Sequence, residues 1–402
     1  MRDVCVVGLG YIGLPTASLL ATRGHKVFGV DVSAHVVDTI NAGRIHIVEP
    51  DLDVLVRSAV NSGNLVAGLE PKPADVFILA VPTPHGPNHE PDISYVEASA
   101  RTVAPFVRPG NLVILESTSP VGTTERVAAL LVEGNPALAN PDGSLRVHVA
   151  HCPERVLPGR ILYELVENHR VVGGLDPAST DEAVAFYQSV VRGDVHPTTA
   201  RVAELCKLVE NSYRDVNIAF ANELSIICHE LGIDVREVIR LANRHPRVNI
   251  LNPGPGVGGH CIAVDPWFIV HAAPEHARLI RTAREVNDGK VGWVVNRVRE
   301  RAERFKAPVI GCLGLAYKAD VDDLRESPAL EIAHRLEREF PGQVLACEPY
   351  VKSADGLTLV GLEELLQRAD IVVGLVAHKP FVRVPRRRIE DKVLIDTCGI
   401  WP

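Results

Sequence analysis

Apolar residues in the first part of the chain fall into short runs of strand length, separated by stretches with helical periodicity. The clearest runs cover residues 4–8, 26–31, 76–80, 112–116 and 147–150. Short apolar runs are typical of buried strands, and their alternation with helices is typical of a doubly wound parallel sheet. The pattern therefore predicts an α/β domain over residues 1–195.

Helical periodicity takes over in residues 196–305, with a long pattern free of proline and glycine over 200–231 and a second over 272–305. On the first helix, polar side chains share one side at Lys207, Asn211, Asp215 and Asn222. The other side carries apolar side chains at Leu205, Val209, Val216, Phe220 and Leu224. All-helical segments of this kind commonly serve as linkers or dimer interfaces, so we expect a central helical dimerisation domain.

An α/β rhythm returns in residues 306–402. Strands are expected at 308–313, 344–347, 371–376 and 393–395, with a helix at 327–340. The predicted fold is thus α/β, with two Rossmann-like doubly wound domains joined by the central helical region.

Composition narrows the class of protein. A chain of 402 residues with 46% hydrophobic content can bury two or three cores, which fits this division. The formal charge of −8 argues against a nucleic-acid-binding surface. Uninterrupted apolar runs of membrane-spanning length and a signal-peptide core are both missing from the sequence, so we expect a cytoplasmic protein that does not span a membrane.

A glycine-rich fingerprint links the first predicted strand to the first helix. It consists of Gly8, Gly10, Tyr11, Ile12 and Gly13, and Asp31 ends the next apolar run. Glycines at this spacing let a pyrophosphate approach the backbone at a helix N-terminus, and the carboxylate accepts hydrogen bonds from ribose hydroxyls. Because a carboxylate repels a 2′-phosphate, the sequence predicts NAD rather than NADP as the cofactor.

The eight cysteines show neither a CxxC pair nor a histidine spacing that suits zinc, so we expect reduced thiols and no metal site. Cys261 differs from the others because glycines precede it and Asp265 follows four residues later. A buried, inert thiol is the commoner fate of cysteine. A reactive thiol needs donors or cations nearby, and Lys207 is a candidate neighbour.

Five motifs in fixed order resemble the UDP-glucose/GDP-mannose dehydrogenase family, and the resemblance covers essentially the whole chain. They are the fingerprint at 8–13 and the segments 117–122, 206–211, 258–261 and 314–320. Two further segments, 152–160 and 245–250, look like the UDP-N-acetylmannosamine branch of that family. The resemblance implies a four-electron oxidation of a sugar C6 alcohol to a uronic acid, with two NAD molecules reduced in sequence.

Site residues follow from the same resemblance. Cys261 matches the thiol that carries a thiohemiacetal and then a thioester, and Lys207 and Asn211 match groups that assist the alcohol oxygen. Asp265 and Thr118 match residues that order the thiol and a water, and Glu154 matches a carboxylate that assists hydrolysis. The cofactor set comprises Gly8, Gly10, Tyr11, Ile12, Gly13, Asp31, Pro82, Thr83 and Thr118.

The implied substrate-binding set extends from residue 154 to residue 325. It comprises Glu154, Arg155, Val156, Lys207, Asn211, Arg214, His245, Arg247, Gly258, Tyr317, Lys318 and Arg325. Lysine and arginine suit a diphosphate. Arg247 matches an arginine that reaches the substrate from the neighbouring subunit, which implies a homodimer.

One departure bears on the choice of sugar. UDP-glucose dehydrogenases carry a second acidic residue four positions after the one matched by Glu154, whereas this chain has Pro158. The resemblance therefore favours UDP-N-acetyl-D-mannosamine, with UDP-N-acetylglucosamine and UDP-glucose as alternatives. A two-electron alcohol dehydrogenase, or a redox-inactive regulator that binds NAD or a nucleotide sugar on the same fold, remains open as well.

Overall fold

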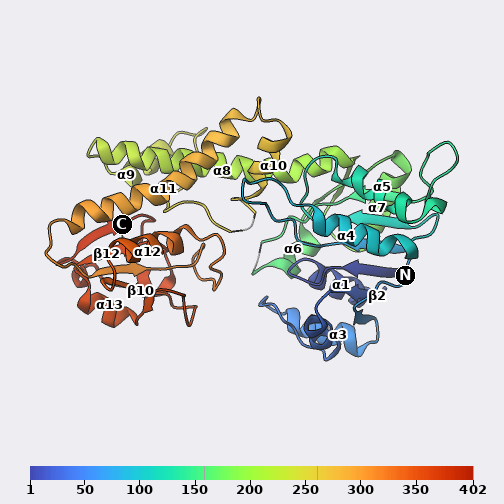
Figure 1. Cartoon of the computed structure of the whole chain (residues 1–402), viewed down its shortest axis with the longest axis horizontal. Coiled ribbons are helices and arrows are strands. Elements are labelled where there is room, and N and C mark those ends of the chain that lie inside the picture. The colour runs from blue at the N-terminus through green and yellow to red at the C-terminus, as the bar shows by residue number, and fades with distance from the viewer. Residues whose placement is uncertain (158, 260, 402) are drawn as a thin grey trace. The chain divides into compact units, whose positions relative to one another are not determined.

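The computed structural model describes residues 1–157, 159–259 and 261–401 (Figure 1). The chain divides into two compact units, Met1–Glu210 and Asn211–Pro402. Pro158 and His260, which belong to segments singled out from the sequence, lie outside the described residues. The described part of the chain contains no helix that is long and apolar enough to cross a bilayer.

The first unit is built on an eight-stranded sheet with the order β3-β2-β1-β4-β5-β6-β7-β8. The strands are β1 (Asp3–Val7), β2 (Lys26–Val30), β3 (Leu65–Gly68), β4 (Val76–Leu79), β5 (Leu112–Leu115), β6 (His148–His151), β7 (Arg170–Gly174) and β8 (Val195–Thr199). Neighbouring strands pair in parallel, except that β7 runs antiparallel to β6. The order reverses at β1, which places β2 and β4 on its two sides.

Helices cover both faces of this sheet. They are α1 (Gly13–Thr22), α2 (Ala34–Asn41), α3 (Leu52–Asn61), α4 (Ser94–Val103), α5 (Thr123–Gly134), α6 (Ile161–Glu167) and α7 (Pro177–Gln188), with short 3₁₀ turns at Ala104–Phe106 and Pro136–Leu138. Alternate residues of one strand enter different cores: Val4 belongs to the core that includes residues of α1, α3 and α7, whereas Cys5 belongs to the core that includes residues of α4 and α5. The doubly wound class predicted from the sequence is confirmed.

The long helix α8 (Ala200–Glu230) begins in the first unit and continues in the second. It buries the polar side: Asp215 and Asn222 are fully buried, whereas Leu205, Val209 and Phe220 are exposed. Amphipathic helices usually turn their apolar side inward. The reversal here requires buried polar partners on the neighbouring helices and leaves an apolar stripe uncovered.

Three more helices accompany α8 in the second unit, namely α9 (Val235–Ala242), α10 (Asp265–Ala272) and α11 (Arg278–Ala302). The helix expected at 272–305 is shorter than predicted, because Pro274 follows the end of α10 and separates it from α11. Buried Arg284 of α11 donates to Asp215 Oδ1 at 2.7 Å, and Asn287 donates to the same oxygen at 2.8 Å. These bonds give the buried Asp215 carboxylate a cation and an amide donor on α11.

The second unit also contains a five-stranded parallel sheet with the order β11-β10-β9-β12-β13. Its strands are β9 (Ile310–Leu313), β10 (Val344–Cys347), β11 (Thr358–Leu359), β12 (Ile371–Gly374) and β13 (Val393–Asp396). Its helices are α12 (Pro328–Glu339), α13 (Leu362–Arg368) and α14 (Lys379–Val382), with a 3₁₀ turn at Arg386–Arg388. The second Rossmann-like sheet predicted from the sequence is present, while the division into three domains at 195 and 305 stays a prediction.

Loss of the buried cation on α11 should be far more costly than loss of an exposed one. Arg284→Leu leaves the Asp215 carboxylate buried without its charge partner, and we expect the free energy of unfolding to fall by about 3–5 kcal/mol. The control is Arg299→Leu on the same helix, whose partner Glu339 is solvent-accessible, with an expected loss of about 0–1 kcal/mol. Urea unfolding followed by circular dichroism compares the two, and equal losses would contradict the buried pair.

Candidate functional site

The turn between β1 and α1 is shaped to admit a phosphate. Gly8 has a φ of +89°, and a Cβ there would lie 2.5 Å from the Ala80 carbonyl oxygen. A Cβ on Gly13 would lie 1.8 Å from the Gly8 carbonyl oxygen, whereas one on Gly10 would meet no atom within 4 Å. Gly8 and Gly13 are therefore required by the protein's own packing, while the backbone at Gly10 is open to a ligand. Tyr11 and Ile12 complete the turn.

Asp31 lies directly after β2 and is half-buried. Its Oδ2 accepts a hydrogen bond from Leu9 N at 3.1 Å, and its Oδ1 accepts one from Ser33 N at 2.9 Å. These bonds fix the carboxylate beside the glycine turn and leave lone pairs for a ribose hydroxyl. The carboxylate acceptor of Asp31 and the open backbone at Gly10 fit a dinucleotide cofactor.

Other predicted cofactor residues follow the neighbouring strands of the same sheet. Pro82 and Thr83 follow β4, and half-buried Thr118 follows β5. The carboxyl ends of parallel strands share one edge of a sheet, so these residues lie at the edge that carries Gly8 and Asp31. The first unit thus brings the predicted cofactor set together.

Glu154, Arg155 and Val156 follow β6 on a segment that is tied down at several points. Arg155 Nε and Nη2 donate to the two carboxylate oxygens of Glu210 at 3.1 and 2.6 Å. Its Nη1 donates to the His169 carbonyl oxygen at 3.2 Å. Arg155 was predicted to bind substrate. In the structure its guanidinium is paired with the carboxylate of Glu210.

Two acidic residues of α8, which the sequence analysis did not single out, attach this helix to the loops after β5 and β6. Buried Glu204 accepts hydrogen bonds from Gly122 N at 2.7 Å and from Thr124 N at 2.8 Å. Glu210 is the partner of Arg155. Lys207, half-buried, lies between these two attachment points. The first turns of α8 therefore hold Lys207 on the side of the Thr118 and Glu154 loops.

Asn211 lies one helical turn beyond Lys207 on α8, in the second unit. Its Nδ2 donates to Asp265 Oδ2 at 2.5 Å, and Asp265 is buried at the first position of α10. The Asp265 amide in turn donates to the Cys261 carbonyl oxygen at 2.9 Å. One carboxylate thus joins the polar face of α8 to the turn that presents the exposed Cys261.

The glycines before Cys261 are required by a close approach of the 317–326 loop. A Cβ on Gly258 would lie 2.3 Å from the Glu326 carbonyl oxygen, and one on Gly259, whose φ is +82°, would lie 2.9 Å from the Tyr317 ring. Exposed Lys318 is on the same loop, and exposed Arg325 donates to both oxygens of Asp323 at 2.9 and 2.7 Å. The thiol turn and the predicted nucleotide-binding loop therefore pack together within the second unit.

The remaining predicted residues are at the surface of the second unit. Arg214, His245 and Arg247 are exposed. Asn243 closes the base of the loop that carries two of them, since its side chain accepts from Ile250 N at 2.7 Å and donates to Ile250 O at 3.0 Å. Arg247 thus projects from a short loop whose ends are pinned.

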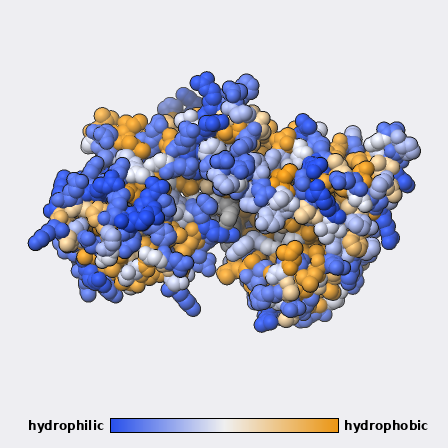
Figure 2. Space-filling view, in the orientation of Figure 1, coloured by the Kyte–Doolittle hydropathy of each residue, from blue (hydrophilic) through white to orange (hydrophobic). Residues whose placement is uncertain are grey.

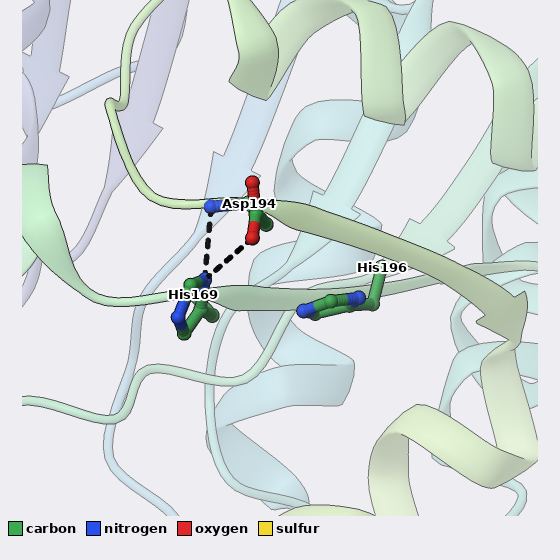
Figure 3. Close-up of side chains that lie close together, drawn as sticks. All are labelled: His169, Asp194 and His196. Carbon is green, nitrogen blue, oxygen red and sulfur yellow. Dashed lines mark hydrogen bonds and ion pairs between the residues drawn. The ribbon is translucent and has the colours of Figure 1, made fainter.

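One group among the described residues has the donor set of a metal site. His169, Asp194 and His196 lie on one face of the β7–β8 edge, with ligand atoms within 4.8 Å of one another (Figure 3). All three are exposed, and His169 Nδ1 already accepts a hydrogen bond from Asp194 N at 3.0 Å. The cluster belongs to none of the segments predicted to bind cofactor or substrate.

Family models match almost the whole chain. Residues 2–191 match the NAD binding domain of the UDP-glucose/GDP-mannose dehydrogenase family. Residues 201–289 match the central domain of that family, and residues 311–402 match its UDP binding domain.

Individual relatives agree with these matches. The chain is 58% identical to the NDP-N-acetyl-D-galactosaminuronic acid dehydrogenase of Ralstonia nicotianae, over 100% of this chain and 96% of that protein. It is 54% identical to the UDP-N-acetyl-D-mannosamine dehydrogenase of Yersinia pestis, over 100% and 99% respectively. The solved structure of a UDP-D-ManNAc dehydrogenase from Pyrococcus horikoshii superposes with a TM-score of 0.92 at 40% identity, covering 100% of this chain and 96% of that chain.

The position of Asp31 predicts how the protein discriminates between cofactors. NADPH should bind at least about tenfold more weakly than NADH, a difference of roughly 1.4 kcal/mol, because its 2′-phosphate would meet the carboxylate. Asp31→Asn keeps an oxygen acceptor and should narrow this ratio. Titration of nucleotide fluorescence gives both dissociation constants without any substrate, and equal values in the wild-type protein would remove Asp31 from the ribose site.

Proposed function

Since the chain belongs to the UDP-glucose/GDP-mannose dehydrogenase family and is an NAD-dependent UDP-sugar dehydrogenase, we propose that it oxidises the C6 alcohol of a UDP-N-acetylhexosamine to the carboxylate. The observation that carries this proposal is the Asn211–Asp265 hydrogen bond and the link from Asp265 to the Cys261 turn. It fixes an amide, a carboxylate and a thiol on one small part of the second unit.

In the first half-reaction the alcohol loses a proton from its oxygen and a hydride from C6, and becomes an aldehyde. Bound NAD supplies the electron acceptor in both half-reactions. Lys207 assists removal of the proton or stabilises the oxygen from which it leaves, and Asn211 donates a hydrogen bond to the same oxygen. Their positions one turn apart on α8 support this assignment, because residues four apart lie on one face of a helix.

In the second half-reaction the Cys261 thiol adds across the aldehyde carbonyl to give a thiohemiacetal. Loss of a hydride from C6 and of the hydroxyl proton converts this adduct to a thioester, and water cleaves the thioester to release the acid and restore the thiol. Asp265 orders the thiol turn, Thr118 orders the water, and Glu154 assists hydrolysis. Exposure of Cys261 in the turn before α10 supports the role of nucleophile.

For the sugar itself we propose UDP-N-acetyl-D-mannosamine. Support comes from the segment 152–160, from Pro158 where UDP-glucose dehydrogenases carry a second acid, and from the 54% identical Yersinia pestis enzyme. A galacto-configured UDP-N-acetyl sugar is the second candidate, because the 58% identical Ralstonia nicotianae protein is named for N-acetyl-D-galactosaminuronic acid.

We also propose that the protein acts as a homodimer formed along α8. Exposed apolar side chains follow this helix at helical spacing at Val202, Leu205, Val209, Tyr213, Phe220 and Ile227. Figure 2 shows hydrophobic residues at the surface near the end of α8 that adjoins α9. A continuous apolar stripe of this length is uncommon on a monomer. In such a dimer Arg247, on its pinned loop, would serve the substrate of the neighbouring subunit.

A panel of UDP-sugars tests the substrate proposal. With NAD present, UDP-N-acetyl-D-mannosamine should be converted fastest, and two NADH should form for each acid released. Mass detection of the acid together with absorbance of NADH measures both quantities. Fast conversion of the galacto-configured sugar alone would select the second candidate, and turnover of UDP-glucose without any N-acetylated sugar would contradict both.

Mixing two inactive variants tests the shared site. Arg247→Ala should impair substrate use while leaving the fold intact, because the side chain is exposed, and Cys261→Ala should be inactive. Exchange of subunits between them should restore some activity, since a mixed dimer contains one site with both residues intact. Heterodimers verified by mass that remain inactive would count against contribution of Arg247 across the interface.

A further inference from the structure

The Glu154 carboxylate is paired with the buried guanidinium of Arg170. Arg170, the first residue of β7, is 6% exposed, and its Nη2 donates to Glu154 Oε2 at 3.1 Å. Its Nη1 lies 3.7 Å from Cys152 Sγ, and its guanidinium lies 5.0 Å from the centre of the Tyr187 ring. The planar fork therefore contacts three side chains at once, an arrangement that lysine cannot reproduce.

Glu116, directly after β5, is the second carboxylate of this cluster. The Tyr187 hydroxyl donates to Glu116 Oε1 at 2.7 Å. Burial raises the pKa of Glu116 to about 7, with a further rise from Glu154, while Arg170 opposes the shift. Burial also raises the pKa of the Cys152 thiol to about 12, so that this group is neutral in the working range. Of the groups around Arg170, Glu154 contributes most to holding its guanidinium charged.

Burial alone would disfavour the charged form of Arg170, yet Glu154 and its other neighbours hold the pKa of the guanidinium well above its ordinary value. The guanidinium therefore stays charged in spite of its burial. Removing the cation would leave the Glu154 carboxylate, which is 8% exposed, in a poorly solvated position without its counter-charge.

The space around Arg170 is too small for a substrate. A cavity of about 10 Å³ lies between Arg170, Glu116, Tyr187 and Thr16. This volume is that of a single water molecule at most. Arg170 consequently acts on the chemistry only through the groups that it contacts.

The other oxygen of Glu154 is held from a different direction. Glu154 Oε1 accepts a hydrogen bond from Arg155 N at 2.6 Å, and the Arg155 side chain is fixed in turn by Glu210 of α8. With both oxygens held, the carboxylate has one orientation. Of the two contacts, only the one from Arg170 is donated by a side chain, because the Arg155 donor is a backbone amide.

We propose that Arg170 is a positioning residue that holds the Glu154 carboxylate in the orientation needed to assist hydrolysis of the Cys261 thioester. The inference rests on the proposed function, in which Glu154 assists that step. It predicts that loss of Arg170 slows deacylation, while both oxidations and the binding of the UDP-sugar are maintained.

Burst kinetics of four proteins test this: wild type, Arg170→Met, Glu154→Gln and the double variant, each mixed with NAD and the best UDP-sugar. Arg170→Met should release a rapid burst of two NADH per subunit and then turn over on the order of a hundredfold more slowly, as expected for a misplaced catalytic group. KM should change less than about twofold. The double variant should match Glu154→Gln, because Arg170 acts through that carboxylate.

Two controls separate this role from a loss of fold. Arg192→Met removes an exposed arginine of the same unit, whose partner is Glu167, and should leave the kinetics unchanged. Arg170→Lys keeps the charge without the fork, so it should turn over more slowly than wild type and faster than Arg170→Met. If the methionine variant fails to fold, slower turnover of the lysine variant than of wild type is the result expected. Circular dichroism establishes that each protein is folded.

The outcomes distinguish the two claims. If Glu154→Gln turns over like wild type, the role proposed for Glu154 in hydrolysis is wrong. Glu154→Gln itself should show the burst. If adding Arg170→Met to it slows turnover by the same factor as in the wild-type protein, Arg170 acts independently of Glu154 and the inference is overturned. Wild-type turnover of Arg170→Lys would also overturn it.

Discussion

Parallel pairing of strands is the constraint on which the rest of this structure depends. Because parallel strands present their carboxyl ends at one edge of a sheet, the turns after β1, β2, β5 and β6 bring together residues that are far apart in the sequence. Gly8, Asp31, Thr118 and Glu154 all occupy such positions. The sheet of the second unit repeats this arrangement, with Gly314 in a left-handed conformation after β9 and Tyr317 on the loop that follows.

The second constraint is the reversed amphipathicity of α8. A helix that buries Asp215 and Asn222 needs partners for each, and Arg284 and Asn287 of α11 provide them. Fixing these polar groups also fixes the part of α8 that carries Asn211, which belongs to the same unit. The uncovered apolar side is then available for a second copy of the chain. Thus a pattern that usually marks a solvated face here marks a face of the helix that is partly buried.

Local signals were sufficient to predict much of the fold and cofactor loop. The spacing of Gly8, Gly10 and Gly13 within one segment was enough to predict a phosphate-binding turn. The apolar strands end within a residue or two of the predicted positions, because a buried strand needs continuous apolar residues. The antiparallel direction of β7 was not predictable, because neighbouring strands leave no mark of direction in a single sequence. The exposed β8 contains Pro197 and lacks a continuous apolar run.

The supporting residues of the site depend on contacts between distant segments. In the sequence, Arg170 is one basic residue at the start of an apolar run. Only the tertiary structure brings its guanidinium into contact with the Glu154 carboxylate. In the sequence, Glu204 and Glu210 are ordinary polar residues of a helix. In the structure they bind Thr124 and Arg155, which lie after β5 and β6. Spacing reveals a motif within one segment, whereas an ion pair between segments requires the tertiary structure.

The central claim is a covalent intermediate at Cys261, and intact-protein mass measurement of Cys261→Ser with NAD and the UDP-sugar tests it most directly. Serine is a poorer nucleophile and its ester hydrolyses slowly, so the variant should lose acid formation while it still binds both ligands. The account predicts an ester adduct that maps to position 261. Acid formation at the wild-type rate, with two NADH per sugar and without an adduct, would contradict it and favour oxidation of a free aldehyde hydrate.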